Sequence, residues 1–537
     1  MYPPILGTGA PPRQRPVRAS HRLAANCRHA GADAVNLPEP QLAPAGAPPL
    51  LPAQRRFASL GAPYVAQVPT APLAEPQLAH FNAGLAEEIG LAPGCAGEAW
   101  FLRAMSGDGA WGGYAPASSV YAGHQFGVFV PQLGDGRAHL IAETTGPDGR
   151  RWELQLKGSG RTPFSRFADG RAVLRSSIRE YLASEAMHAL GIPTTRALCL
   201  VASSEPVARE TVETGAMVCR VAPGFVRFGH FEFFYYRGQY ERLAPLAEHL
   251  VAEHFPEFAG RADRHAAWLT EVTERTARLM ARWQAVGFCH GVMNTDNFSA
   301  LGLTLDYGPY GFMDGFDARH ICNHTDQGGR YAYDQQPAIG HWNCSRLLQA
   351  TLPLLAEDPQ EAVAIATAIL ERFPKAYAAA MTRAWADKLG LIELRDGDPE
   401  LINRFVAILD RGHSDFTRSF RGLAQVRSDG EAPPPLRDEI LDLAGFDPWL
   451  ADYRQRLRGE GTDDAARAAR MNTVNPKYVL RNHLAQAAIE QAQAGDFGEV
   501  GRLMQLLRRP FDEQPAMEHY AAVPPPEAAH IEVSCSS

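Results

Sequence analysis

The stretch that decides the fold is His290-Gly291-Val292-Met293-Asn294-Thr295-Asp296-Asn297, which Asp306-Tyr307-Gly308 follows shortly afterwards. It places two carboxylates and an amide within a short span, and the second carboxylate begins an Asp-aromatic-Gly triplet. Hard oxygen ligands of this kind hold a divalent cation against a triphosphate and leave room for phosphate oxygens and water. The stretch therefore predicts a metal-assisted nucleotide site.

Protein kinases carry a related pattern, in which His-Arg-Asp is followed by an Asn and later by Asp-Phe-Gly. On that template His290 takes the place of the His, Asn297 that of the Asn, and Asp306 begins the Asp-x-Gly. The place of the catalytic Asp falls on Val292, and a carboxylate occurs at Asp296 instead. The loop therefore belongs either to an inactive kinase or to a site with a different chemistry.

A β-hairpin is predicted upstream, from the run AHLIAETT at 138–145 and the run RWELQLK at 151–157, which a Gly-Pro-Asp-Gly turn separates. The hairpin is preceded by the glycine-rich sequence QLGDGR at 132–137. Glycines at such a turn let the backbone approach phosphates closely. Gly-x-Gly alone is also common in ordinary tight turns, so this motif needs support from others.

Support comes from Lys157, at the end of the second predicted strand, and from Glu180, within a stretch of helical spacing over 171–190. A strand lysine followed by a helix glutamate is the kinase arrangement in which the carboxylate holds the ammonium over phosphates. Each residue alone could be an ordinary surface charge. Their order, from glycine-rich loop to Asp-x-Gly, is far more specific than any one of them.

Two arginines follow in or near β-type runs, Arg220 at the end of GAMVCRV and Arg227 within GFVRFGH. Each could be a surface charge, but the planar guanidinium suits bidentate contacts with phosphate. A cleft that holds Lys157, Arg220 and Arg227 would bind a triphosphate more deeply than a kinase does.

The predicted fold class is α+β, with a protein-kinase-like bilobal architecture. A β-rich N-terminal lobe is expected over 55–234 and a mainly α-helical C-terminal lobe over 235–537. Helices are expected at 76–91, 171–190, 245–254 and 262–286. Residues 1–54 are rich in Pro, Ala and Arg, and we expect this extension to be disordered.

The composition narrows the class of protein. The net charge of −8 argues against a nucleic-acid partner, and no apolar run reaches the roughly 20 residues that span a bilayer. Eight cysteines without a CxxC pair suit a reducing compartment. We expect a cytoplasmic monomer without a membrane partner; the alternative is a mitochondrial protein whose residues 1–54 are a transit peptide, although their many prolines oppose the amphipathic helix this requires.

Two groups of soft ligands could serve other roles. His320, Cys322 and His324, with His341 and Cys344 downstream, could bind zinc, but their spacing fits no common structural zinc site. Cys535 lies two residues from the C-terminus, where it is either an incidental exposed thiol or a redox-active one.

Taken together, these motifs resemble the selenoprotein O family over roughly residues 55–537. The matching strings are QLGDGR at 132–137, LQLKGSGRTPFSRFADGRAVLRSSIREYL at 154–182, HGVMNTDNFSALGLTLDYGPYGFMDGFD at 290–317, NPKYVLRNHLAQ at 475–486 and SCSS at 534–537. The resemblance implies a kinase-like fold that binds ATP in a flipped orientation. It also implies transfer of AMP to Ser, Thr or Tyr hydroxyls of proteins, release of pyrophosphate, and Mg²⁺ as the cation with Mn²⁺ as the alternative.

The resemblance also implies roles for individual residues. Asp296 would accept the proton of the hydroxyl, Asn297 and Asp306 would bind the metal, and Glu180 would pair with Lys157. Cys535 stands where many eukaryotic members carry selenocysteine, and a disulfide between Cys322 and Cys535 fits the family pattern. The residues expected to contact the nucleotide are Gly134, Gly136, Arg137, Lys157, Asp169, Gly170, Arg220, Arg227 and Asp306.

Two alternatives to protein adenylylation remain at this stage. One is a kinase with residual γ-phosphoryl transfer, and the other is a nucleotide-binding pseudokinase that serves as a scaffold without catalysis.

Overall fold

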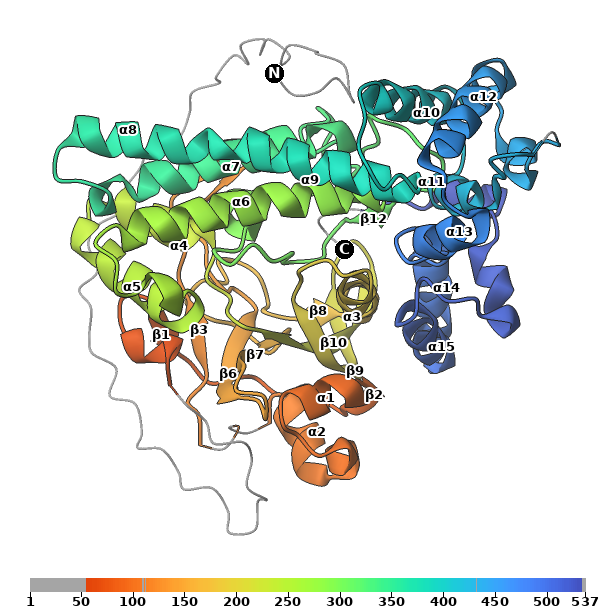
Figure 1. Cartoon of the computed structure of the whole chain (residues 1–537). Helices are drawn as coiled ribbons and strands as arrows, with labels where there is room; N and C mark the ends of the chain where they lie inside the picture. The colour runs from red at the N-terminus through yellow and green to blue at the C-terminus, as the bar shows by residue number, and fades with distance from the viewer. Residues whose placement is uncertain (1–54, 109–110, 112, 431, 534–537) are drawn as a thin grey trace, which may run out of the picture.

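The computed structural model describes residues 55–108, 111, 113–430 and 432–533. The N-terminal half of this chain is built on an antiparallel sheet, and the C-terminal half is helical (Figure 1). The α+β fold with a β-rich and a helical part is therefore confirmed. The expected disordered extension, 1–54, lies outside the described residues. None of the helices within the described ranges is both long and apolar enough to cross a membrane.

The main sheet is antiparallel throughout, and its strands run in the order β1-β3-β6-β7-β10-β9-β2, with β8 paired to β10. The predicted hairpin is confirmed as β6 and β7, which form the centre of the sheet together with β10 and β9. The strands are β1 (Val65–Gln67), β2 (Gln77–Phe81), β3 (Ala117–Ser119), β6 (Ala138–Thr145), β7 (Arg151–Lys157), β8 (Ala172–Val173), β9 (Arg196–Ala208) and β10 (Val212–Ala222).

The two faces of this sheet have different partners. Leu154 on β7 and Val221 on β10 pack with α1 (Ala83–Glu88) and α2 (Ala99–Met105) in one apolar cluster. Side chains alternate between faces along a strand, so Gln155, Lys157 and Arg220 point to the opposite face. That face is covered by α3 (Leu174–Ala189), which carries Glu180. The alternation thus places the predicted charges between the sheet and α3.

The helical half begins with a short helix, α4, and continues with the long helix α6, which lies against α7 and α9 (Figure 1). On α6, Leu269, Val272, Thr276 and Met280 recur at the spacing of one helix face, and all four are buried. The helices are α4 (Phe228–Tyr235), α5 (Leu243–His254), α6 (Arg264–Ala285), α7 (Gln336–Ala350), α8 (Pro359–Leu370), α9 (Arg372–Lys388), α10 (Asp398–Gly412), α11 (Phe416–Gly422), α12 (Leu443–Glu460), α13 (Asp464–Asn472), α14 (Asn482–Gln493) and α15 (Gly498–Leu507).

The C-terminal helices return to the N-terminal half, because both α14 and α15 pack against α3. Arg179 of α3 donates one hydrogen bond to Asn482 Oδ1 at 3.2 Å and another to the carbonyl of Tyr310 at 2.6 Å. Its guanidinium also lies over the Tyr310 ring, 4.5 Å from the centroid. α3 is therefore held both by the segment after Asp306 and by the C-terminal helices.

The helix expected at 76–91 is wrong in its first half. Gln77–Phe81 forms β2, which pairs with β9, and only Ala83–Glu88 is helical. The boundary is Asn82, whose side chain accepts a hydrogen bond from Leu85 N at 3.2 Å and caps α1. Pairing with β9 outweighs the weak amphipathic pattern of the first five residues.

Candidate active site

The carboxylate of Glu180 lies between Lys157 and Arg220. Lys157 Nζ bonds to Glu180 Oε2, and Arg220 Nε bonds to Glu180 Oε1. Arg220 Nη1 also reaches Gln155 Oε1 at 3.1 Å, because these two residues are register partners across β7 and β10. Burial lowers the pKa of Lys157 to about 8, while Glu180 opposes that shift. The predicted pair of Lys157 with Glu180 is thus formed, and Arg220 joins it.

Asp306 is bound by two arginines. Arg220 Nη2 bonds to Asp306 Oδ1, and Arg227 Nη1 bonds to Asp306 Oδ2. Burial raises the pKa of Asp306, but Arg220 and Arg227 outweigh it and hold that pKa well below its usual value. Asp306 has a φ of 57°, in the left-handed region that Asp and Asn adopt more readily than other side chains. The residue that the motif assigns to the metal is therefore already neutralised by two cations.

Arg227 also connects Asp306 to the catalytic loop. Its Nη1 donates to the backbone carbonyl of Asp296 at 2.7 Å, and its guanidinium lies over the Tyr121 ring, 5.0 Å from the centroid. Tyr121 lies in the segment before the glycine-rich turn and was not among the predicted residues.

The catalytic loop is closed at its base, because β11 (Phe288–Cys289) pairs with β12 (Gly311–Phe312). His290 is buried, bonds to the carbonyl of Leu305 at 2.9 Å and stacks on Trp283 at 5.1 Å between ring centroids. Asn297 Nδ2 donates to the carbonyl of Val292 at 3.0 Å. Val292 thus serves the loop through its backbone, which explains why its side chain need not be polar.

Asp296 is almost fully buried, with 7% of its surface exposed. Its Oδ2 accepts a hydrogen bond from Gln125 Nε2 at 3.2 Å, while its Oδ1 has no hydrogen-bond partner among the described residues. A Cβ on Gly123 would lie 2.5 Å from that Oδ1, so only glycine allows this approach. Burial raises the pKa of Asp296 to about 7. A carboxyl group with such a pKa can accept a proton near neutral pH.

Gly123 and Gln125 belong to a hairpin, β4 (Gly123–Gln125) paired with β5 (Val128–Val130), that lies on the catalytic loop. Sequence analysis gave no role to this segment, which reads as a glycine-rich loop around aromatics. The strands are joined by the two-residue turn Phe126-Gly127, whose φ angles of 50° and 83° suit a tight turn between strands. Gly127 is the only turn signal in the sequence, because Phe is unusual at the first turn position.

The hairpin is tied to the catalytic loop through Thr295. His124 N donates to Thr295 Oγ1 at 2.7 Å, and Thr295 Oγ1 donates in turn to Glu232 Oε2. The His124 ring bonds to the other oxygen of Glu232 at 2.5 Å. Glu232 comes from α4 and is fully buried. This network fixes the position of Thr295 and therefore of the neighbouring Asp296. Short-range sequence patterns do not reveal the network, because its members are far apart in the sequence.

The glycine-rich turn packs against the segment that contains Phe164. A Cβ on Gly134 would lie 2.5 Å from the Phe164 ring, and one on Gly136 would lie 3.0 Å from the Phe164 carbonyl. Both glycines are therefore required by the segment that packs over the turn. Arg137 follows the turn, and burial lowers its pKa while Glu180 opposes the shift. Its charge therefore acts on the carboxylates of Glu180 and Asp306, as do the charges of Lys157 and Arg220.

Asp169 and Gly170 lie at the edge of this group. Asp169 pairs with Arg209 at 2.7 Å and accepts a hydrogen bond from Arg171 N at 2.9 Å. Gly170 crosses the chain at Gly160, where a Cβ would lie 2.2 Å from a backbone carbon. Both residues thus stabilise the loop that contains them, and no contact among the described residues joins either of them to Asp306.

Asn297 and Asp306 provide the donor types that a hard cation prefers. The amide nitrogen of Asn297 is used by Val292, so its oxygen remains available, and Asp296 Oδ1 is buried nearby without a hydrogen-bond partner among the described residues. Within those residues, no three His, Cys, Asp or Glu side chains gather as a complete metal site. A cation here would therefore need further oxygens from a bound nucleotide.

The cysteine and histidine residues considered for zinc have other partners. Cys322 is buried, and its Sγ donates to the carbonyl of Pro309 at 3.0 Å, while Cys344 is buried on α7. His324 N donates to the carbonyl of Val533 at 3.2 Å, which brings the C-terminal segment to within two residues of Cys322 in the sequence. Cys535 lies outside the described residues, so its disulfide with Cys322 stays a prediction.

Comparisons with known proteins find similar sequences over most of the chain. A family model described as "Protein adenylyltransferase SelO" matches residues 50–508. A protein from Methylococcus capsulatus named "Protein nucleotidyltransferase YdiU" is 61% identical over 483 residues, which cover 90% of this chain and 95% of the relative. Proteins of the same name from Burkholderia orbicola and Burkholderia pseudomallei are 53% and 54% identical, and each comparison covers 90% of this chain and at least 95% of the relative.

Proposed function

Because the chain belongs to the SelO family of protein adenylyltransferases, we propose that it transfers AMP from ATP to Ser, Thr or Tyr hydroxyls of proteins and releases pyrophosphate. The ATP would bind in a flipped orientation, with its β- and γ-phosphates beside Lys157, Arg220 and Arg227. Mg²⁺, or Mn²⁺ in its place, would be the cation, held by Asn297 and Asp306.

The observation that carries the proposal is the excess of cations around Asp306. Four cations, Lys157, Arg137, Arg220 and Arg227, face this region, and the carboxylates bonded to them are Glu180 and Asp306. Asp135 and Asp296 also lie near Arg227, but burial raises the pKa of both carboxyl groups, so they compensate its charge less. Buried positive charge that exceeds buried negative charge is costly unless an anion joins it. The phosphates of a nucleotide provide such an anion, and guanidinium groups bind them in bidentate geometry. This cluster of cations is therefore suited to deeply bound phosphates.

The chain's own residues divide the work of the reaction. Lys157, Arg220 and Arg227 hold the β- and γ-phosphates, so the α-phosphorus faces the acceptor hydroxyl. Asp296 accepts the hydroxyl proton, with Gln125 and Gly123 holding its carboxylate in place. A bound divalent cation would neutralise charge on the leaving pyrophosphate. Val292 needs no carboxylate in this scheme, because the base stands at Asp296.

The scheme requires the arginines to change partner. Arg220 and Arg227 both bond to the carboxylate of Asp306, so they compete with a metal for it. We predict that Arg227→Gln raises the affinity for Mn²⁺ alone by about tenfold, equivalent to about 1.4 kcal/mol, and lowers the affinity for ATP. Titration of the nucleotide-free protein with Mn²⁺, followed by electron paramagnetic resonance, measures the first effect. Unchanged or weaker Mn²⁺ binding in a folded variant would contradict the competition.

The proposed reaction is tested with ATP labelled at either the α- or the γ-phosphate. We expect protein to become labelled only from the α-phosphate, because AMP is the transferred group. Labelling only from the γ-phosphate would identify a kinase and refute the proposal. Nucleotide binding without any labelling would instead support a scaffold. Boiled protein and an excess of unlabelled ATP serve as controls for non-covalent label.

A further inference from the structure

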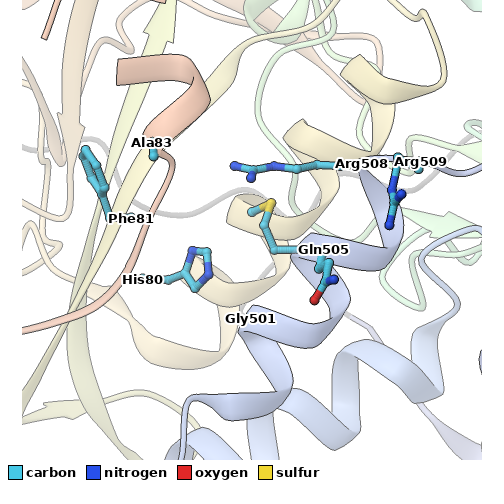
Figure 2. A pocket seen from close by; sticks show the side chains of 8 residues that line it. His80, Phe81, Ala83, Gly501, Gln505, Arg508 and Arg509 are labelled. Carbon is cyan, nitrogen blue, oxygen red and sulfur yellow. The ribbon is translucent and has the colours of Figure 1, made fainter. Parts of the chain in front are cut away.

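A groove of about 630 Å³ opens where β2 and the start of α1 meet α15, away from the catalytic loop (Figure 2). Its N-terminal side is formed by His80, Phe81 and Ala83, and its C-terminal side by Gly501, Met504, Gln505, Arg508 and Arg509. In Figure 2 the Arg508 side chain reaches from α15 toward Ala83, above His80. None of these residues belongs to the site described above.

The groove carries positive charge that the described residues do not neutralise. Arg508 donates to the neutral amide oxygen of Asn82, which fixes its guanidinium without compensating the charge. Within the described part of the chain, neither Arg508 nor Arg509 pairs with a carboxylate, whereas Arg502 on the preceding helix α15 pairs with Glu499 at 2.6 Å. Two adjacent arginines without a carboxylate partner stand out on a chain whose net charge is −8. They point to an anionic ligand.

The groove also borders a free sheet edge. β2 is the last strand of the main sheet and pairs on one side with β9; on its other side, no strand of the described chain pairs with it. An unpaired strand edge offers backbone N–H and C=O groups to an extended peptide. Phe81, which is half-buried, adds apolar surface beside that edge. A ligand that uses all of these features is extended, acidic and partly apolar.

We propose that this groove docks an extended acidic segment of the protein substrates, with its backbone along β2 and its carboxylates on Arg508 and Arg509. The inference rests on the proposed function, since it assumes that proteins are the acceptors. The groove is joined to the cleft by α3: the His80 ring bonds to Tyr181 OH at 2.8 Å, and Tyr181 is the neighbour of Glu180 in the sequence. Docking here would hold a substrate against the helix that organises the phosphate site.

The test uses the full chain and a fluorescein-labelled peptide, Glu-Leu-Glu-Val-Glu-Leu-Glu, without ATP. Fluorescence anisotropy is measured for the wild type, for Arg508→Glu, for Arg509→Glu and for Arg470→Glu. Arg470 is the matched control, because it is exposed on α13 and does not line the groove. We expect each groove variant to weaken binding by about tenfold and the control by less than about twofold.

Gln505→Glu provides a second variant that does not disturb the contact with Asn82, and it should also weaken peptide binding, because it adds a negative charge to the groove. Thermal melting confirms that each variant is folded. Equal weakening by Arg470→Glu would overturn the proposal, as it would show unspecific attraction. Displacement of the peptide by millimolar inorganic phosphate, or equal binding of the Gln-for-Glu peptide, would overturn it as well. Since no ATP is present, these results are independent of whether AMP is transferred.

Discussion

Asp306→Asn is expected to lower the rate of AMP transfer by at least about 10³-fold, comparable to the loss of a main electrostatic group in other active sites. The carboxylate is the only charged oxygen donor in the proposed metal pair of Asn297 and Asp306, and an amide binds a divalent cation far more weakly. The rate is measured as incorporation of α-labelled AMP into protein at saturating ATP and Mg²⁺.

Asn is the substitution that isolates this effect. Asp306 has a φ of 57°, a conformation that costs roughly 1 kcal/mol for most side chains but is better tolerated by Asn. Ala would therefore combine backbone strain with the loss of the metal ligand. Arg220 and Arg227 also lose their shared carboxylate in either variant, so thermal melting must show that the protein remains folded. A folded Asp306→Asn protein with wild-type AMP transfer would place the metal elsewhere.

The order of motifs along the chain predicted much of this site. Lys157 and Glu180 bond to each other as predicted. In a bilobal fold the strand and the helix that carry them face each other, so each charged side chain has few other partners. The hairpin of β6 and β7 was likewise readable, because its turn chemistry and its β-type runs agree.

Other contacts between distant segments could not be predicted. The pairing of Asp306 with both arginines depends on how β10, α4 and the catalytic loop come together, which no local pattern encodes. The β4–β5 hairpin has three-residue strands, too short for a clear alternation, yet it supplies Gln125 to Asp296. β2 was mistaken for helix for a similar reason: its identity is decided by β9. The missed elements are thus those whose structure is set by tertiary partners.

Asp296→Asn is the second variant for which we expect a large loss, of about 10²- to 10⁴-fold, the usual contribution of a general base. The wild type should show a distinctive pH dependence. Burial raises the pKa of Asp296 to about 7, and the base must be ionised, so kcat/KM should rise with pH and level off above about 7. This inflection should be absent from the residual activity of Asp296→Asn.

Gln125→Leu offers a separate control on the assignment. The hydrogen bond from Gln125 favours the ionised form and lowers the pKa of Asp296. Its removal should therefore move the inflection to higher pH without abolishing activity. An unchanged profile in both Gln125→Leu and Asp296→Asn would exclude Asp296 as the base.

Stability gives a readout of the same ionisation that needs no substrate. Since the folded-state pKa of Asp296 is raised, the unfolded chain binds fewer protons between about pH 4 and pH 7, and the free energy of unfolding falls as pH rises through this range. Its contribution is fully present below pH 4 and is lost above about 7. Asp296→Asn cannot ionise, so its stability relative to the wild type should increase from pH 5 to pH 8. Denaturant melts at both pH values measure the change, and a constant difference would mean that the buried carboxyl is already ionised at pH 5.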